Sequence, residues 1–400
     1  MSAGILHIKD SYYFEVPKFL APSHRTKRSE FADYWVRLDP DYQDWEAQQQ
    51  LALLEDSTIE LPENPDHLLA DYHAWRAEGG NFAKPFDRFL EEAPANKWFQ
   101  EQLKDNASVA GKWDLIKQKA NDVVAYDAEA APWSEAKIAD YNHQLSGKLL
   151  IPQPFGELRN HYQMESGFGI SKYMVLLLVA AILLFVLFRK VADVLQSGKR
   201  TRLTNLIESI LGYIRDQIAV PTIGKHDAEK YVPFLWTLFM FILVCNLLGM
   251  IPFLGSPTAS FAVTATLALT VICVTIGSGV KRFGVLGFLK NQVPHMDLHP
   301  AMAFVIVPMI WLIEMLGFFI KHLVLSIRLL ANMVAGHMVL LALMGIAVGT
   351  AGLASWYVAA PLSLFGALAI DCLELLVAFL QAYVFTFLAG LFIGSAIHEH

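Results

Sequence analysis

The sequence predicts an all-α membrane protein that carries a soluble, mostly helical N-terminal extension. Hydrophobic residues make up 54% of its 400 residues, and charge is divided unequally along the chain. Residues 1–170 contain 17 Lys and Arg against 28 Asp and Glu, whereas residues 171–400 contain 14 against 10. The second part also contains uncharged runs long enough to cross a bilayer, for which about 20 residues suffice.

Residues 1–165 are expected to form an acidic extension on the outer face of the membrane. Six of the nine tryptophans lie here, which is typical of a folded segment. Short helices joined by turns are expected early, followed by a more regular helical region whose apolar stripe comprises Trp98, Leu103, Trp113, Ile116, Val123 and Val124. The extension is either an accessory docking domain or shield, or a solvated extension with a small core.

Residues 166–300 are expected to hold three membrane spans and two basic loops. The spans are uncharged and cover Tyr173–Phe188, Tyr231–Phe253 and Phe261–Val280. Basic residues cluster in the connections Arg189–Arg202 and Lys281–Lys290. Because short loops rich in Lys and Arg stay on the cytoplasmic side, these loops are expected inside, which leaves the acidic extension outside.

Residues 301–400 do not fit ordinary spans. Ala301–Thr350 and Trp356–Ile397 are helix-compatible throughout, and as helices each would be roughly 60–75 Å long, about twice the hydrocarbon thickness. Each is either two spans with a concealed turn or one steeply tilted helix in a hairpin around Gly349–Ser355. Polar spacing favours the tilted hairpin, because Glu314, Lys321 and Arg328 recur every seven residues, as do Glu374 and Gln381.

Arg328 is the most informative single residue. The run from Leu329 to Ile370 contains no Asp, Glu, Lys or Arg, and His337 is its one histidine. A guanidinium cannot shed its proton, and its charge costs at least a few kcal/mol at the bilayer centre. Arg328 therefore has to face a carboxylate or a water-filled cavity, unless it is a structural partner of Glu314 or Glu374.

Other chemistry is not indicated. The histidines of the N-terminal part lack metal-site spacing, and no phosphate-binding loop of the GxxxxGK type is present. Cys245, Cys273 and Cys372 lie in apolar segments and are expected to be buried thiols. We therefore expect no cofactor, no metal, no nucleotide site and no nucleic-acid partner.

Several motifs carry a resemblance to a known family. The sequence SIRLLANMVAGH, Ser326–His337, resembles the signature of subunit a of F-type ATP synthases. NLLGMIP, Asn246–Pro252, and the PTASFAVTATLAL that follows resemble the family's second and third spans, and LELLVAFLQAYVFTFL, Leu373–Leu388, resembles its last helix. The resemblance covers about residues 165–400 and leaves residues 20–150 without a counterpart in the common short form.

The resemblance implies a role for individual residues. Arg328 corresponds to the essential charge facing the c-ring, Glu314 to the inner half-channel, and the outer half-channel group comprises Asn332, His337, Glu374 and Gln381. Many bacterial members carry the acid and the imidazole at the exchanged positions, so which of His337 and Glu374 titrates stays open. From the residues alone, His337 could equally be a hydrogen-bonded core histidine, and Asn332 and Gln381 could bond between helices.

The function that the resemblance implies is proton translocation through the Fo sector of a rotary ATP synthase. Two half-channels would deliver and remove protons at c-ring carboxylates, and this subunit itself would be non-catalytic. Implied partners are the c-ring, b-type peripheral-stalk subunits, other Fo subunits and the lipid bilayer, in a bacterial cell membrane rather than a mitochondrial one. An independent transporter would show internal repeats, which are not evident, and a membrane-anchored scaffold would leave Arg328 unexplained.

Overall fold

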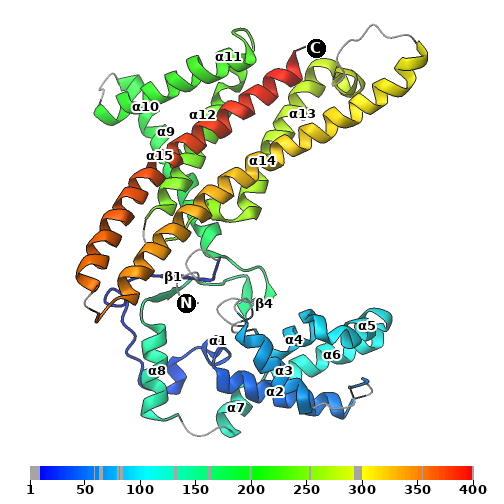
Figure 1. Ribbon diagram of the computed structural model, residues 1–400, viewed down its shortest axis with the longest axis vertical. Helices are drawn as coiled ribbons and strands as arrows, with labels where there is room; N and C mark the ends of the chain where they lie inside the picture. Colours follow the sequence, from blue (N-terminus) through cyan, green and yellow to red (C-terminus); the bar gives the residue numbers. More distant parts are fainter. Residues whose placement is uncertain are drawn as a thin grey trace. The chain divides into compact units, whose positions relative to one another are not determined.

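The computed structural model describes residues 10–57, 59–62, 66–78, 81, 84–129, 133–159, 164–197, 201–251, 254–291, 300–353 and 355–398 (Figure 1). It divides into two compact units, Ser11–Ser171 and Lys172–His400, which are described separately. Lys199 and Arg200 of the first predicted basic loop lie outside the described residues, as do the last two residues of the predicted second span.

The second unit contains helices joined by turns and short connections, with no strand among its described residues. Its elements in chain order are α9 (Lys172–Ser197), α10 (Arg202–Tyr213), the π-helical turn η3 (Ile214–Ala219), α11 (Val220–Ile223), α12 (Ala228–Gly249), the 3₁₀ turn η4 (Pro257–Ala259), α13 (Phe261–Asn291), α14 (Pro300–Gly349) and α15 (Trp356–Ile397). Five of these helices are long and apolar enough to cross a membrane, namely α9, α12, α13, α14 and α15. The predicted fold class, an all-α membrane protein, is confirmed.

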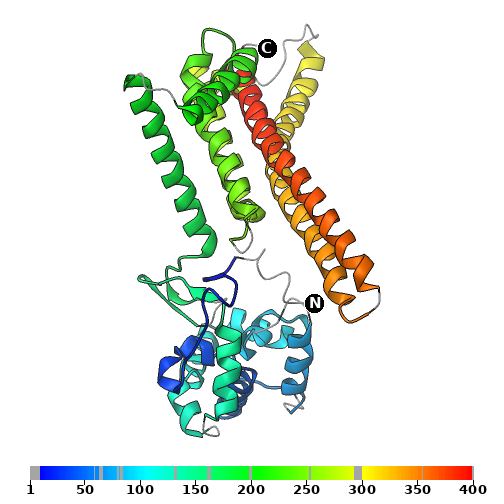
Figure 2. The same cartoon turned by 90° about the vertical axis from the view of Figure 1, so that its left-hand side faces the viewer.

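Helices α14 and α15 are continuous, with 50 and 42 residues respectively. Of the two alternatives, each segment is therefore a single long helix and not two spans with a concealed turn. The two helices lie side by side as a hairpin in both views (Figures 1 and 2). Gly352 allows the chain to reverse here, because its φ of 85° lies in the left-handed region that favours glycine.

Large apolar side chains on α14 and α15 remain exposed in the isolated chain, as expected for helices that face lipid or another subunit. The expectation that all three cysteines are buried is wrong for two of them. Cys245 is buried, but Cys273 and Cys372 are exposed. An apolar run in a membrane helix has one face toward lipid, so apolar neighbours in sequence do not guarantee burial in protein.

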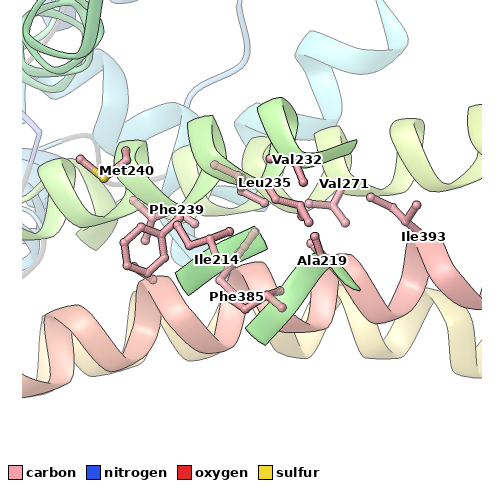
Figure 3. Packing of buried hydrophobic residues seen from close by; sticks show 14 of the residues in the cluster. Ile214, Ala219, Val232, Leu235, Phe239, Met240, Val271, Phe385 and Ile393 are labelled. Carbon is pink, nitrogen blue, oxygen red and sulfur yellow. The ribbon is translucent and has the colours of Figure 1, made fainter. Parts of the chain in front are cut away.

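A short helical segment, α10–η3–α11, braces the bundle. Thr201 caps its start by accepting a hydrogen bond from the Thr204 backbone. Ile214 and Ala219 pack against α12 and α15 in the main core, beside Leu235, Phe385 and other residues (Figure 3). The carbonyl oxygen of Thr222 lies so close to Gly394 of α15 that a Cβ there would meet it at 2.0 Å. Only glycine permits that approach, which is how small residues bring membrane helices together.

The first unit is a small helical domain with two short antiparallel ribbons. Its elements are β1 (Tyr13–Glu15), η1 (Arg28–Glu30), α1 (Asp33–Val36), α2 (Pro40–Glu55), α3 (Asp66–Ala77), α4 (Phe86–Glu92), η2 (Pro94–Asn96), α5 (Lys97–Asp105), α6 (Ala107–Ala120), α7 (Val123–Glu129), α8 (Glu135–Leu145), β2 (Lys148–Leu150), β3 (Gly156–Leu158) and β4 (Met164–Gly167). Strand β1 pairs with β2, and β3 with β4. The sequence predicted the helices but not these ribbons.

The predicted apolar stripe of the first unit is largely correct. Trp113, Ile116 and Val123 are buried in the domain's core, while Trp98 and Leu103 pack on its edge. The prediction for Val124 is wrong, since this residue is 77% exposed. Helix α7 begins afresh at Val123 after a break, so the helical phase of α6 does not continue and the next residue points outward.

A buried charge cluster joins α2, α4 and the end of β3. The Arg159 guanidinium donates to Glu46 Oε1 at 2.8 Å and to Asp87 Oδ2 at 2.6 Å. Both carboxylates are 2% exposed. Burial raises the pKa of Glu46 to about 7, and the Arg159 charge opposes that rise. Two carboxylates thus share one cation inside the domain.

This cluster predicts how the stability of the domain depends on pH. The pKa of an unfolded Glu is about 4.3, so the folded domain binds more protons between that value and about 7. The free energy of unfolding should therefore fall as pH rises through this window, by on the order of 2–3 kcal/mol. Urea titrations of the full chain, followed by tryptophan fluorescence at pH 5 and pH 8, measure the difference.

The variant Glu46→Gln should remove most of this pH dependence. Glu55→Gln, which alters an exposed carboxylate at the end of α2, is the matched control and should retain it. An unchanged pH dependence in Glu46→Gln would contradict the assignment.

Candidate functional site

The contact between α14 and α15 brings His337 and Glu374 together. His337 Nδ1 lies 3.0 Å from Glu374 Oε1, with side-chain exposures of 13% and 5%. Gly336 makes room for the carboxylate, because a Cβ at this position would lie 2.9 Å from Glu374 Oε1. The pair is therefore set at the interface of the hairpin by a glycine adjacent to the histidine.

The other ring nitrogen determines what this pair can hold. His337 Nε2 lies 3.1 Å from the carbonyl oxygen of Gly249, which can only accept, so Nε2 carries the hydrogen. One further proton then belongs to the contact between Nδ1 and Oε1. It makes either an imidazolium beside a carboxylate or a neutral imidazole beside a carboxylic acid, and the two forms bind the same number of protons.

The contact is close enough for an ion pair, yet it is poorly aligned for a hydrogen bond. Within the described part of the chain, neither His337 Nδ1 nor Glu374 Oε1 has a well-aligned hydrogen-bond partner. The contact thus places an imidazole nitrogen and a carboxylate oxygen within range of an exchangeable proton. This arrangement suits a group that must both take up and release protons.

A narrow crevice beside the pair is lined by two other predicted site residues and by their neighbours. Its lining comprises Asn246, Leu329, Asn332, Met333, Glu374, Val377, Ala378 and Gln381. Asn332 and Gln381, one from each helix of the hairpin, thus line one space with Glu374. The two amide groups and the carboxylate therefore line the same crevice.

Asn246 has a structural part in this crevice. Its amide donates to the Ala378 carbonyl at 3.2 Å, and its Oδ1 accepts from Thr258 Oγ1 at 3.0 Å. Thr258 in turn contacts Ser256 at 2.8 Å. All three side chains are buried. This network ties α12 and η4 to α15 and so fixes one wall of the crevice.

Arg328 lies outside this crevice. Its side chain is partly buried, between the buried Leu325 and Leu329. No ion pair or hydrogen bond of its guanidinium is found among the residues that the structure describes. Of the two carboxylates considered as structural partners, Glu374 contacts His337 and Glu314 contacts Lys321. The arginine therefore has no counter-charge within the described chain.

Glu314 lies 14 residues before Arg328 on α14, which is about four helical turns. Lys321 Nζ lies 3.4 Å from Glu314 Oε1, and their side chains are 56% and 46% exposed. An exposed pair of this kind contributes about 0–1 kcal/mol, so Glu314 is not held firmly. The structure thus brings Asn332, His337, Glu374 and Gln381 into one group and leaves Glu314 and Arg328 apart from it.

Sequence reasoning missed some of the site. His322, which follows Lys321, received no catalytic role from the sequence, yet it is fully buried between the rings of Phe318 and Phe392, with ring centroids at 4.5 and 4.3 Å. Gly336 was not singled out, although a glycine directly before a histidine in an apolar helix is a signal for close approach. Thr258 lay within a quoted motif without an assigned role, and Ser256 directly precedes that motif.

In the part of the chain that the structure describes, five membrane-capable helices, a partly buried arginine without an ion pair and an acid–imidazole pair between two long helices indicate an integral membrane protein with charged and titratable groups within its helices. The sequence profile described as ATP synthase A chain matches residues 173–394, more than half of the chain. The chain therefore belongs to the ATP synthase A chain family.

Similar proteins agree with this assignment. ATP synthase subunit a of Chloroherpeton thalassium is 38% identical over 272 residues, covering 66% of this chain and 78% of that protein. ATP synthase subunit a 2 of Chlorobaculum tepidum is 40% identical over 285 residues, covering 68% and 78%. ATP synthase subunit a of Myxococcus xanthus is 38% identical over 243 residues, covering 58% and 75%.

The close approach at Gly336 generates a prediction. A methyl group in Gly336→Ala would displace the Glu374 carboxylate from His337, because the added Cβ would lie 2.9 Å from its oxygen. Passive proton conductance through the assembled membrane sector should fall about tenfold, which corresponds to about 1.4 kcal/mol. Gly345→Ala on the same helix is the control, since no atom lies within 4 Å of a Cβ there. Equal conductance in the two variants would contradict the role of this contact.

Proposed function

We propose that Arg328, His337 and Glu374 carry out the proton translocation that this chain performs in the Fo sector as a member of its family. The observation that carries the proposal is the charge balance of the hairpin. Both acids considered as partners contact other groups, so Arg328 needs a carboxylate from another chain. The c-ring carboxylate is the partner that fits, because it is negatively charged only while it is deprotonated.

The polar group at the hairpin supports a role as the outer half-channel. A proton entering through the crevice meets Asn332 and Gln381 and is held between His337 and Glu374. From there it neutralises a ring carboxylate, which can then rotate into lipid because a neutral acid costs far less to bury than a charged one. His337 and Glu374 act as one titrating unit in this scheme.

The inner half-channel is assigned to Glu314. An arriving protonated site releases its proton toward this carboxylate, becomes anionic and pairs with Arg328. A membrane potential supplies about 2.3 kcal/mol per charge per 100 mV, so the pairing has to be of that order to gate and still break at each step. Arg328 thereby separates the two half-channels and prevents a direct proton leak.

The surface around Arg328 suits a closely packed helical partner. Ala331 and Ala335 follow at three and seven residues, and both are exposed, while Val324 and Ile327 are exposed apolar neighbours. Small residues let helices approach each other closely in a membrane. This exposed strip of α14 is the proposed contact with the c-ring.

The chain is a membrane protein that associates with other ATP synthase subunits. The bacterial relatives support a location in a bacterial cell membrane. The basic loops are proposed to lie on the cytoplasmic side, which leaves Ser11–Ser171 outside. b-type stalk subunits and the remaining Fo subunits are the further proposed partners. Neither nucleic acid nor a cofactor enters this scheme.

One prediction of this proposal concerns Arg328. Arg328→Ala should abolish proton-driven ATP synthesis, by at least about a hundredfold, while the complex still assembles, because the ring carboxylate loses its counter-charge. Membrane vesicles containing the purified complex provide the assay, with subunit composition checked by gel electrophoresis. Leu330→Ala, two residues on, is a control for helix disruption. Normal coupled synthesis with Arg328→Ala would refute the assignment.

A second prediction concerns the first unit, proposed as a dispensable accessory domain. Gly147 N donates to the Ala21 carbonyl at 2.9 Å, so these two residues lie close together. A short Gly-Ser linker can therefore replace residues 22–146 while the paired strands β1 and β2 are both retained. The truncated complex should conduct protons at the normal rate but assemble less efficiently. Proton flux and protease access from the outer side are the measurements. A fully assembled truncated complex that does not conduct, or cleavage from the inner side alone, would overturn the accessory role or the topology.

A further inference from the structure

A second polar pocket lies away from the proposed proton pathway. It has a volume of about 620 Å³ and is formed by the start of α12, the middle of α13 and the end of α15. Its lining comprises Asp227, Lys230, Tyr231, Val274, Gly277, Ser278, Lys281, Arg282 and Ile397. None of these residues has a part in the mechanism above.

The pocket is positively charged and partly prearranged. Asp227, 6% exposed, binds Lys230 at 2.7 Å and Arg282 at 3.1 Å. The single carboxylate therefore orients two cations and neutralises only one. Lys281 is exposed and forms no ion pair among the residues that the structure describes. The rim thus carries a net positive charge that an anion can compensate.

The wall of the pocket is apolar. Val274 and Ile397 line it beside the ring of Tyr231, and Gly277 leaves its floor open, since a Cβ there would meet no atom within 4 Å. The uncharged part of α13 ends immediately before Lys281. Cations above an apolar wall at the end of a membrane span lie at the depth where hydrocarbon gives way to headgroups.

We propose that this pocket binds an anionic glycerophospholipid, with its phosphate between Lys281 and Arg282 and an acyl chain along Val274 and Ile397. A free phosphate ion would use only the rim and leave the apolar wall without a partner. A zwitterionic lipid would bring its own positive group against the three cations. The combination of a cationic rim and an apolar wall therefore selects an anionic lipid, and the proposal depends on membrane insertion but not on the proton pathway.

The test uses the full chain in phosphatidylcholine nanodiscs that contain a small amount of spin-labelled phosphatidylglycerol or spin-labelled phosphatidylcholine. Electron paramagnetic resonance gives the fraction of each label that the protein immobilises. The excess for phosphatidylglycerol measures selective binding. Lys281→Gln removes the unpaired cation, and Gly277→Leu fills the floor without changing charge.

Wild-type protein should immobilise phosphatidylglycerol at least twofold more than phosphatidylcholine, and each variant should lose at least half of that excess. Lys190→Gln, which alters another exposed basic residue at the end of a span, should retain it. Equal immobilisation of the two lipids in the wild type, or equal losses in Lys281→Gln and Lys190→Gln, would overturn the proposal. Displacement of the lipid by inorganic phosphate at constant ionic strength would also overturn it, in favour of a free anion.

Discussion

The proposed function rests on one charge, that of Arg328, which no ion pair among the described residues of its own chain neutralises. Arg328 lies partly buried in a 50-residue apolar helix, and a guanidinium without a counter-charge in an apolar setting costs several kcal/mol. The acids Glu314 and Glu374 each contact another group. A partner subunit that supplies a carboxylate would remove this free-energy cost. In the proposed mechanism the carboxylate is charged only part of the time, so its pairing with Arg328 can control proton passage.

The hairpin of α14 and α15 gives this charge its surroundings. Its length exceeds the hydrocarbon thickness about twofold, so it tilts and extends a polar group across the depth of the membrane. Gly336 brings the two helices together at the acid–imidazole pair, and Gly249 supplies the carbonyl that fixes the tautomer of His337. In the proposed mechanism, proton storage at His337 and Glu374 and charge compensation at Arg328 are separate tasks, and Arg328 and His337 lie about two and a half helical turns apart on α14.

Much of this arrangement follows from the sequence. Uncharged runs predicted the three helices α9, α12 and α13, and the seven-residue spacing of polar residues favoured the long hairpin of α14 and α15. The spacing of Glu374 and Gln381 also indicated the face on which both line one crevice. Packing details did not follow, because they depend on contacts between distant segments. The burial of His322 between two aromatic rings and the room that Gly336 leaves for Glu374 are of this kind. The two β-ribbons of the first unit were missed because their strands have three or four residues, too few for an alternating pattern to be recognised.

The central claim is that Arg328 meets a carboxylate from another subunit. A density map of the assembled membrane sector, at a resolution that shows side chains, tests it most directly. The account predicts that the Arg328 guanidinium lies within about 4 Å of a ring carboxylate, the usual limit for an ion pair, with His337 and Glu374 still in contact behind it. An Arg328 that pairs with Glu314 or Glu374 of its own chain, with the ring seated against a different surface, would contradict it.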